Sequence, residues 1–237
     1  MRGVFVTGTG TGVGKTLIAA GLLKALRDSG VSALPVKPVQ TGCLEIDGGL
    51  SAPDLEFCLK VAGVAPDESL IRLMCPFRYS PACSPHLAGK MTGVYPDVGT
   101  VARKMDRLSG SCDFLVAEGA GGILVPLNDS EKMIDLMVEL GWPVVLAARG
   151  DLGTINHSLL SLAVLRNAGL RVAAVVVNHL TEEISLVTID NPLAIAQHSG
   201  SVRIVEIPYM QNPEELAGNP CFMERMSELC RSIMEQS

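Results

Sequence analysis

Residues 4–16 read VFVTGTGTGVGKT, an apolar run followed by four alternating glycines, the last of which begins Gly-Lys-Thr. The apolar run predicts a strand, and the pattern from Leu17 to Leu26 predicts a helix. A glycine-rich loop between them lets backbone N–H groups turn around a polyphosphate, at which the positive end of the helix also points. Lys15 can then reach the β- and γ-phosphates, and the Thr16 hydroxyl can bind Mg²⁺. We therefore predict a phosphate-binding loop (P-loop).

The spacing inside this loop departs from the common P-loop pattern by one residue. That pattern needs a glycine five residues before Gly14, where this chain has Thr9; the glycine comes one residue earlier, at Gly8. The longer loop indicates a particular branch of P-loop proteins.

Composition limits the classes of protein to consider. The chain has 237 residues, of which 48% are apolar and 4% aromatic, enough for one aliphatic core. Its net charge of −6 argues against nucleic-acid or acidic-membrane binding. Its seven cysteines lack a CxxC pair, which argues against a disulfide framework. No basic leader is evident, and apolar runs such as Val172–Val177 fall far below the ~20 residues of a membrane span. We expect a cytoplasmic protein.

Strand-like and helix-like segments alternate along the chain, which is typical of a parallel sheet covered by helices. The predicted strands are Gly3–Thr7, Ala33–Val36, Phe114–Ala117, Val144–Ala147, Val172–Val177 and Arg203–Glu206. The predicted helices are Lys15–Ser29, Asp54–Ala62, Thr100–Ser109, Ser130–Leu140, Thr154–Ala168, Pro192–Ser199 and Pro220–Glu235. Residues 63–99, rich in Pro, Ser and Gly, are expected to be the least regular part of the chain and to lie beside the active face. The prediction is a single doubly wound α/β domain over residues 1–237, with a mostly parallel sheet.

Polar residues follow several of these strands, at the sheet edge where such folds bind ligands. Lys37 follows the second strand, where it could neutralise developing negative charge, although an isolated lysine is usually a surface residue. Glu118 ends the strand Phe114–Ala117 and could bind Mg²⁺ together with Thr16. Asp54 is a second candidate ligand, although Ser51, Pro53 and Asp54 together also fit an ordinary helix start.

Three further segments follow strands or turns. Pro81–His86 contains two prolines and by itself indicates a tight turn. Asp151–His157 follows a strand and begins a helix, whose N-terminus could bind a carboxylate, while His157 more often caps or packs at such a place. Asn178 ends the strand Val172–Val177 and could present its amide to a nucleobase.

These motifs in this order resemble the dethiobiotin synthetases, from Val4 to about Glu214. The resemblance rests on VTGTGTGVGKT, KPVQTG (37–42), Asp54, CSPH (83–86), VAEGAGG (116–122), GDLGTINH (150–157), VVN (176–178) and EIPYM (206–210). It implies a P-loop ATPase-like fold, a homodimer, and the ATP- and Mg²⁺-dependent joining of 7,8-diaminononanoate and CO₂ to give dethiobiotin. A carbamate and a carbamic–phosphoric anhydride are the implied intermediates.

The same resemblance implies roles for particular residues. Lys37, Lys15 and Thr16 are the expected catalytic residues, and Thr16, Asp54 and Glu118 the expected Mg²⁺ ligands. The nucleotide is expected to meet Gly12, Val13, Gly14, Lys15, Thr16, Leu17, Asp54, Glu118, Gly119, Ala120, Gly121, Asn178, Pro208, Tyr209 and Met210. The diamine is expected to meet Thr11, Lys37, Thr41, Ser84, Pro85 and Gly121 and, with its distant carboxylate, Leu152, Gly153, Ile155 and Asn156. In the family, the helix start that contains these last four residues comes from the partner subunit.

The chain also departs from the family. His179 stands where an aspartate is frequent, and residues 182–202 look short, so nucleotide preference stays open. Another amidating enzyme of this branch, such as a cobyrinate diamide synthase, would need a glutaminase region for which the chain has no room. A partitioning ATPase would carry a second lysine where the chain has Gly10. A catalytically inactive paralogue would keep the same fold.

Overall fold

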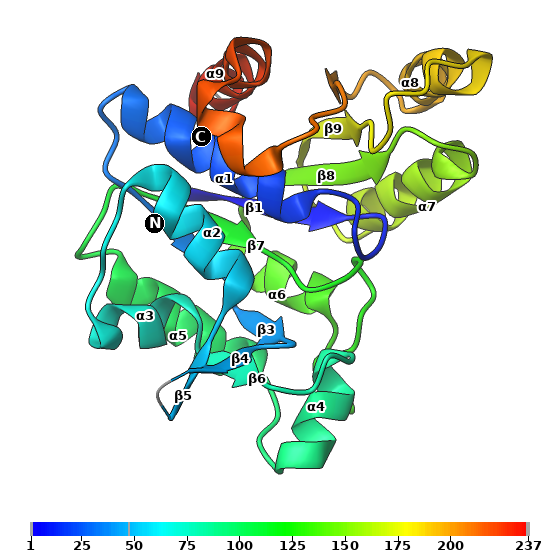
Figure 1. Ribbon diagram of the computed structural model, residues 1–237. Helices are drawn as coiled ribbons and strands as arrows, with labels where there is room; N and C mark the ends of the chain where they lie inside the picture. Colours follow the sequence, from blue (N-terminus) through cyan, green and yellow to red (C-terminus); the bar gives the residue numbers. More distant parts are fainter. Residues whose placement is uncertain (1, 47, 236–237) are drawn as a thin grey trace.

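Six parallel strands form the central sheet of the computed structural model, which describes residues 2–46 and 48–235 (Figure 1). Their order is β10-β9-β8-β1-β7-β2. Their bounds are Arg2–Gly8 (β1), Ala33–Val36 (β2), Phe114–Glu118 (β7), Val144–Arg149 (β8), Val172–Asn178 (β9) and Ile204–Ile207 (β10). The predicted doubly wound α/β class is confirmed. The predicted single domain stays a prediction, and residues 1, 47, 236 and 237 of its range lie outside the described residues.

Helices cover both faces of this sheet, which explains why its strands are apolar throughout. Val4 and Val6 pack in the same core as α1 (Lys15–Asp28) and α9 (Pro220–Glu235). Phe5, between them in the chain, packs in the opposite core. The helices of that second core include α5 (Val98–Leu108), α6 (Met133–Leu140) and α7 (Thr154–Asn167). No helix in the described part of the chain is both long and apolar enough to span a membrane.

The topology brings three strand ends together around the P-loop. β1 pairs with β7 on one side, with Val6 opposite Glu118, and with β8 on the other, with Gly8 opposite Ala147. The P-loop therefore leaves the sheet at the point where the chain switches from one side of β1 to the other. Ligands of doubly wound folds bind at this kind of position.

One helix start was predicted wrongly, and the segment predicted to be least regular contains short elements. Residues 63–99 contain regular structure, namely α3 (Glu68–Met74), β6 (Phe77–Tyr79) and α4 (Pro85–Thr92). The helix predicted to begin at Pro192 begins at Leu186, as α8 (Leu186–His198), and Pro192 lies inside it. Ser185 caps α8: its hydroxyl accepts from the Thr188 N–H at 3.2 Å, and the Thr188 hydroxyl accepts from the Ser185 N–H at 2.9 Å. This capping box, rather than the proline, sets the helix start.

A second, two-stranded sheet borders the carboxyl edge of the main one. Its strands are β3 (Val39–Thr41) and β6, which pair in parallel with Gln40 opposite Arg78. The remaining elements are the hairpin of β4 (Leu44–Ile46) and β5 (Gly49–Ser51), α2 (Pro53–Ala62) and the 3-10 helix η1 (Pro213–Gly218). The small sheet places residues 39–41 beside the N-terminal end of α2, because Gln40 donates a hydrogen bond to Asp54.

Candidate active site

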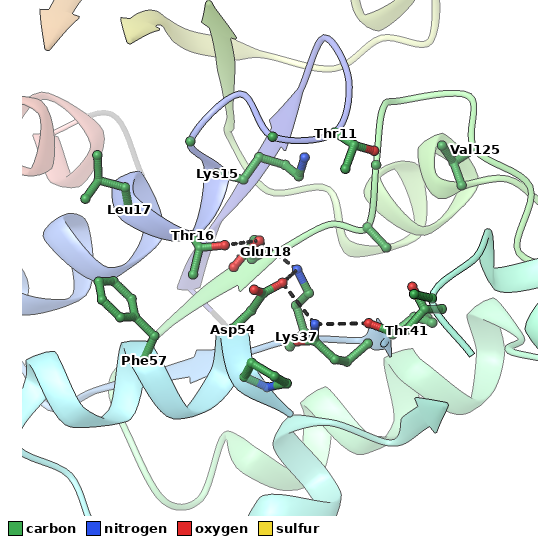
Figure 2. Close-up of a pocket in the computed structure, with 18 of the residues that line it drawn as sticks. Thr11, Lys15, Thr16, Leu17, Lys37, Thr41, Asp54, Phe57, Glu118 and Val125 are labelled. Atoms are coloured by element: carbon green, nitrogen blue, oxygen red, sulfur yellow. Dashed lines mark hydrogen bonds and ion pairs between the residues drawn. The ribbon is translucent and has the colours of Figure 1, made fainter. Parts of the chain in front are cut away.

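A cavity of about 930 Å³ lies at the carboxyl ends of the central strands. It is lined by the P-loop, by the start of α2, by residues 82–85 before and at the start of α4, and by the loop after β7. The predicted site residues that line it are Thr11, Gly12, Gly14, Lys15, Thr16, Leu17, Lys37, Thr41, Asp54, Ser84, Pro85, Glu118, Ala120, Gly121 and Asn178. Folding thus gathers side chains from distant parts of the chain into one site (Figure 2).

The P-loop ends in a helix N-terminus that carries no side-chain cap. Gly14 is the N-cap of α1, with φ 97°, a left-handed conformation that favours glycine. Because no side chain in the described part of the chain caps this helix start, its N–H groups are available to an anion. The Lys15 ammonium lies along the same loop and donates to the Gly10 carbonyl at 2.7 Å.

Four side chains form a connected cluster at the centre of the cavity (Figure 2). Thr16 donates its hydroxyl hydrogen to Glu118 Oε1 at 2.9 Å. Lys37 Nζ lies 2.6 Å from the same Glu118 oxygen and 2.6 Å from Asp54 Oδ2. The lysine is therefore held between two carboxylates, one at the end of β7 and one in the first turn of α2.

Electrostatics and burial set the protonation of this cluster. Burial alone lowers the pKa of Lys37, but the charges of Glu118 and Asp54 outweigh it and raise that pKa above its ordinary value. Burial raises the pKa of Glu118, and the charge of Lys37 offsets only part of this. Burial also acts to raise the pKa of Asp54, but Lys37 and Gln40 outweigh it, so this pKa is lowered. Lys37 is thus firmly a cation.

Lys15 has the opposite tendency. Burial, followed by repulsion from Lys37, lowers its pKa from 10.5 to about 8. Its side chain reaches a carbonyl rather than a carboxylate, so in the protein alone its charge is poorly compensated. A polyphosphate bound along the loop would supply the missing negative charge.

The donor set of the cluster fits Mg²⁺. Thr16, Asp54 and Glu118 offer a hydroxyl and two carboxylates, and Mg²⁺ prefers such hard oxygen ligands, usually with phosphate oxygens and water completing its shell. Among the described residues no group of three or more His, Cys, Asp and Glu side chains forms a separate metal centre. An all-protein cage is not what a nucleotide-bound Mg²⁺ requires.

Several predicted site residues do not line the cavity. Val13 is packed in the core, with its carbonyl accepting from the Asn178 amide at 3.3 Å, and Gly119 offers its carbonyl to Lys37 at 3.4 Å. Pro208, Tyr209 and Met210 follow β10 outside the lining, as do Leu152, Gly153, Ile155 and Asn156 at the start of α7. Within one chain, Pro208–Met210 and the residues at the start of α7 therefore lie outside the cavity lining.

The cavity also includes residues that motif reasoning did not select. They are Val39, Gln40, Pro53, Phe57, Ala82, Cys83, Val125, Leu180 and Pro213. Gln40, Ala82 and Cys83 lie within or next to the quoted motifs, so the motifs already indicated that these parts of the chain belong to the site. Phe57 follows Asp54 by one turn of α2, which helical periodicity could have indicated. Pro213 carries no local signal.

Solved structures share this fold at low sequence identity. The cell division ATPase MinD of Pyrococcus furiosus superposes with a TM-score of 0.64 at 18% identity, covering 100% of this chain and 99% of that one. MinD of Pyrococcus horikoshii, in a complex with Mg-ADP, gives a TM-score of 0.64 at 16% identity, covering 99% and 96%. At such identities the likeness shows the fold alone.

Sequence relatives are closer. A family model described as an AAA domain matches residues 2–215. The ATP-dependent dethiobiotin synthetase BioD of Anoxybacillus flavithermus is 35% identical over 213 residues, which cover 90% of this chain and 94% of that protein. The enzyme of the same name from Clostridium acetobutylicum is 30% identical over 244 residues, covering 99% and 100%. The chain therefore belongs to the ATP-dependent dethiobiotin synthetases, a family of ligases.

Proposed function

We propose that this chain catalyses the ATP- and Mg²⁺-dependent conversion of 7,8-diaminononanoate and CO₂ to dethiobiotin, ADP and phosphate, a step of biotin biosynthesis. The observation that carries the proposal is the placement of two buried lysines, Lys15 on the P-loop and Lys37 between Asp54 and Glu118, in one cavity. The names of the relatives support it. The proposal includes a cytoplasmic location, where ATP and bicarbonate are both available.

The chemistry divides into three steps. An amine of the diamine captures CO₂ and loses a proton, giving a carbamate. A carbamate oxygen attacks the γ-phosphorus of ATP and ADP leaves, giving a carbamic–phosphoric anhydride. The second amine attacks the carbamoyl carbon, and phosphate leaves as the ureido ring closes. Each step builds or moves negative charge on oxygen, so fixed positive charge and positioning supply most of the catalysis.

Lys37 and Lys15 are suited to different steps of this reaction. Lys37, firmly cationic, is the group that we assign to the carbamate. Lys15, on the P-loop, is assigned to the transferring phosphoryl group. The N–H groups at the start of α1 would also stabilise the negative charge of that group. Thr16, Asp54 and Glu118 would hold Mg²⁺, which when bound neutralises phosphate oxygens. We place the nucleobase near Asn178 and Leu180, which line the same cavity.

We further propose a homodimer that completes the substrate site. The N-terminus of α7 follows Gly153, with φ 94°, and among the described residues no side chain caps it and none bonds to the buried Thr154 Oγ1. Leu152 is 86% exposed, and Asn156 is also exposed. Exposed apolar side chains on and after α4, including Met91 and Tyr95, offer a surface for a second subunit. Asn156 of one chain would bind the carboxylate of a diamine held by the other.

Phosphate release with and without the diamine tests the function. The assay contains ATP, Mg²⁺ and bicarbonate, and mass spectrometry detects dethiobiotin. We expect phosphate release that depends on the diamine, with one dethiobiotin formed per phosphate. Phosphate release at the same rate with and without the diamine, and no dethiobiotin, would instead indicate a general ATPase. Nucleotide binding without release under either condition would indicate an inactive paralogue.

A further inference from the structure

Gln40 is a buried polar side chain in the wall of the cavity. It lies on β3, is 7% exposed, and touches the site through its amide nitrogen. Gln40 Nε2 donates to Asp54 Oδ2 at 3.1 Å and, with weaker geometry, to the Thr41 carbonyl at 3.4 Å. It therefore connects the small sheet to the carboxylate at the start of α2.

The surroundings fix which way this amide is turned. Both partners of the nitrogen, a carboxylate oxygen and a carbonyl oxygen, can only accept hydrogen bonds. Exchanging the amide nitrogen and oxygen would place an acceptor against two acceptors, so the orientation is determined by the network. Gln40 thus acts toward Asp54 as a donor.

The hydrogen bond falls on the same Asp54 oxygen that pairs with Lys37. Lys37 Nζ lies 2.6 Å from Asp54 Oδ2, and the side chain of Asp54 is one-third exposed at the rim of the cavity. A carboxylate at the start of a helix with one cationic partner can still turn about its side-chain bonds. A second donor from a different element, at a different angle, restricts that rotation and directs Oδ2 to Lys37.

We propose that Gln40 is a positioning residue that orients Asp54, so that one carboxylate oxygen serves Lys37 while the other is presented to the nucleotide-bound metal ion. This inference rests on the proposed function, in which Asp54 is a metal ligand. Gln40 touches no reacting atom in this scheme. Its effect passes through Asp54 alone.

The other end of the amide supports a functional rather than a stabilising role. Gln40 Oε1 is buried and has no hydrogen-bond partner among the described residues. A buried acceptor without a partner costs folding free energy, so an apolar side chain of similar shape is tolerated or favoured at such a place. A glutamine kept for stability would satisfy both ends.

Metal binding by the ADP complex tests this role without turnover. The probe is Mn²⁺, titrated into protein saturated with ADP, with free Mn²⁺ measured by electron paramagnetic resonance. For Gln40→Met we expect the Kd for Mn²⁺ to rise about tenfold, the loss of one hydrogen bond to a charged group, with Tm unchanged or higher. The matched control is Gln197→Met, an exposed glutamine on α8, for which the Kd should not change.

A double-mutant cycle tests whether Gln40 acts through Asp54. Asp54→Asn should itself weaken Mn²⁺ binding, and adding Gln40→Met should cause little further loss. The same tenfold loss in both backgrounds would overturn the proposal, as would an unchanged Kd with a lowered Tm in Gln40→Met alone. Because these measurements need no diamine, they stand apart from the dethiobiotin assay, whose failure would overturn only the proposed reaction.

Discussion

Lys37 and Glu118 form an ion pair with Nζ 2.6 Å from Oε1, and the two side chains are only 5% and 4% exposed. Charges so deeply buried depend on each other, since either one alone would be left without compensation. The pair joins the end of β7 to the residue after the edge strand β2, two strands that lie side by side. Lys37 is thereby anchored to the neighbouring strand.

Replacement of this lysine should separate chemistry from nucleotide binding. We expect Lys37→Ala to lower kcat by about 10²–10³-fold or more, because the developing carbamate and phosphoryl charges lose a fixed cation. The Kd for ADP should change little, because Lys37 contacts Glu118 and Asp54 rather than the P-loop. Unchanged turnover, measured as dethiobiotin formed per minute, would remove Lys37 from the chemistry.

Gly14 should tolerate no side chain. A Cβ there would lie 2.2 Å from Asn178 Nδ2, and its φ of 97° is strained for any L-residue with a side chain. We expect Gly14→Ala to abolish measurable ADP binding in a titration, since the start of α1 and the Asn178 amide must both move. Gly110→Ala is the control, because a Cβ there meets nothing within 4 Å and its φ is not left-handed. Full ADP affinity in Gly14→Ala would contradict this packing.

Lys15 should make the protein alone more stable as the pH rises. Its pKa falls from 10.5 to about 8 on folding, so between these values the unfolded chain binds more protons and the folded state gains. Below pH 8 the full cost, on the order of 3 kcal/mol, remains. Lys15→Met should therefore raise the free energy of unfolding at pH 7 and do so less at pH 9.5, as urea titrations can measure.

The control for this pH dependence is Lys60→Met, which removes an exposed lysine that is 72% accessible. Its effect on the free energy of unfolding should be small at both pH values. A gain for Lys15→Met that is equal at pH 7 and pH 9.5 would mean that burial of the Lys15 charge is not its source.

Asn156 should affect the diamine without affecting the nucleotide. We expect Asn156→Ala to raise the diamine KM about tenfold, the loss of one hydrogen bond to a carboxylate, with the ATP KM nearly unchanged. In its own chain Asn156 is exposed and lies outside the cavity, so this result would require the site to extend to a second subunit. An unchanged diamine KM would argue against the carboxylate site.

Mixed dimers provide a direct check of a shared site. A dimer of one Lys37→Ala and one Asn156→Ala chain would contain one intact site, with Lys37 from one subunit and Asn156 from the other. After equal amounts of the two variants are mixed and their subunits exchange, about one quarter of all sites in the mixture should be intact. If the activity of the mixture at low diamine only equals the summed activities of the two variants measured separately, both residues belong to the same subunit's site.

Most of the central sheet could be predicted from sequence because its strands are buried on both faces. Runs such as Phe114–Ala117 and Val172–Val177 are continuous and apolar, and each lies at the core of an observed strand. The helix boundary at Pro192 was wrong because proline favours helix starts only when no better cap precedes it, and here Ser185 and Thr188 form one. Local preference was outweighed by a more complete cap.

The candidate site was less predictable where it depends on contacts between distant segments. Lys37, Glu118 and Thr16 follow strands or the P-loop, and strand ends meet at one edge of a parallel sheet. Gln40 lies within the quoted motif KPVQTG, but the motif does not indicate its role, which comes from its hydrogen bond to Asp54, fourteen positions away on another element. Pro208–Met210 follow a strand end as well, but their loop leads past the cavity, whose lining includes Leu180 and Pro213 instead.

The two-stranded sheet of β3 and β6 stands apart from the six strands that carry the P-loop and Glu118. Thr41, assigned to the diamine, lies on this small sheet, and Ser84 and Pro85, assigned likewise, lie at the start of α4, whereas the P-loop, Lys37 and Glu118 lie at strand ends of the large sheet. Substitutions in residues 39–41 and 77–92 can therefore reshape this part of the proposed diamine site while the large sheet stays intact. In the proposed reaction, evolution can thus alter the part of the diamine site at Thr41, Ser84 and Pro85 without altering the P-loop.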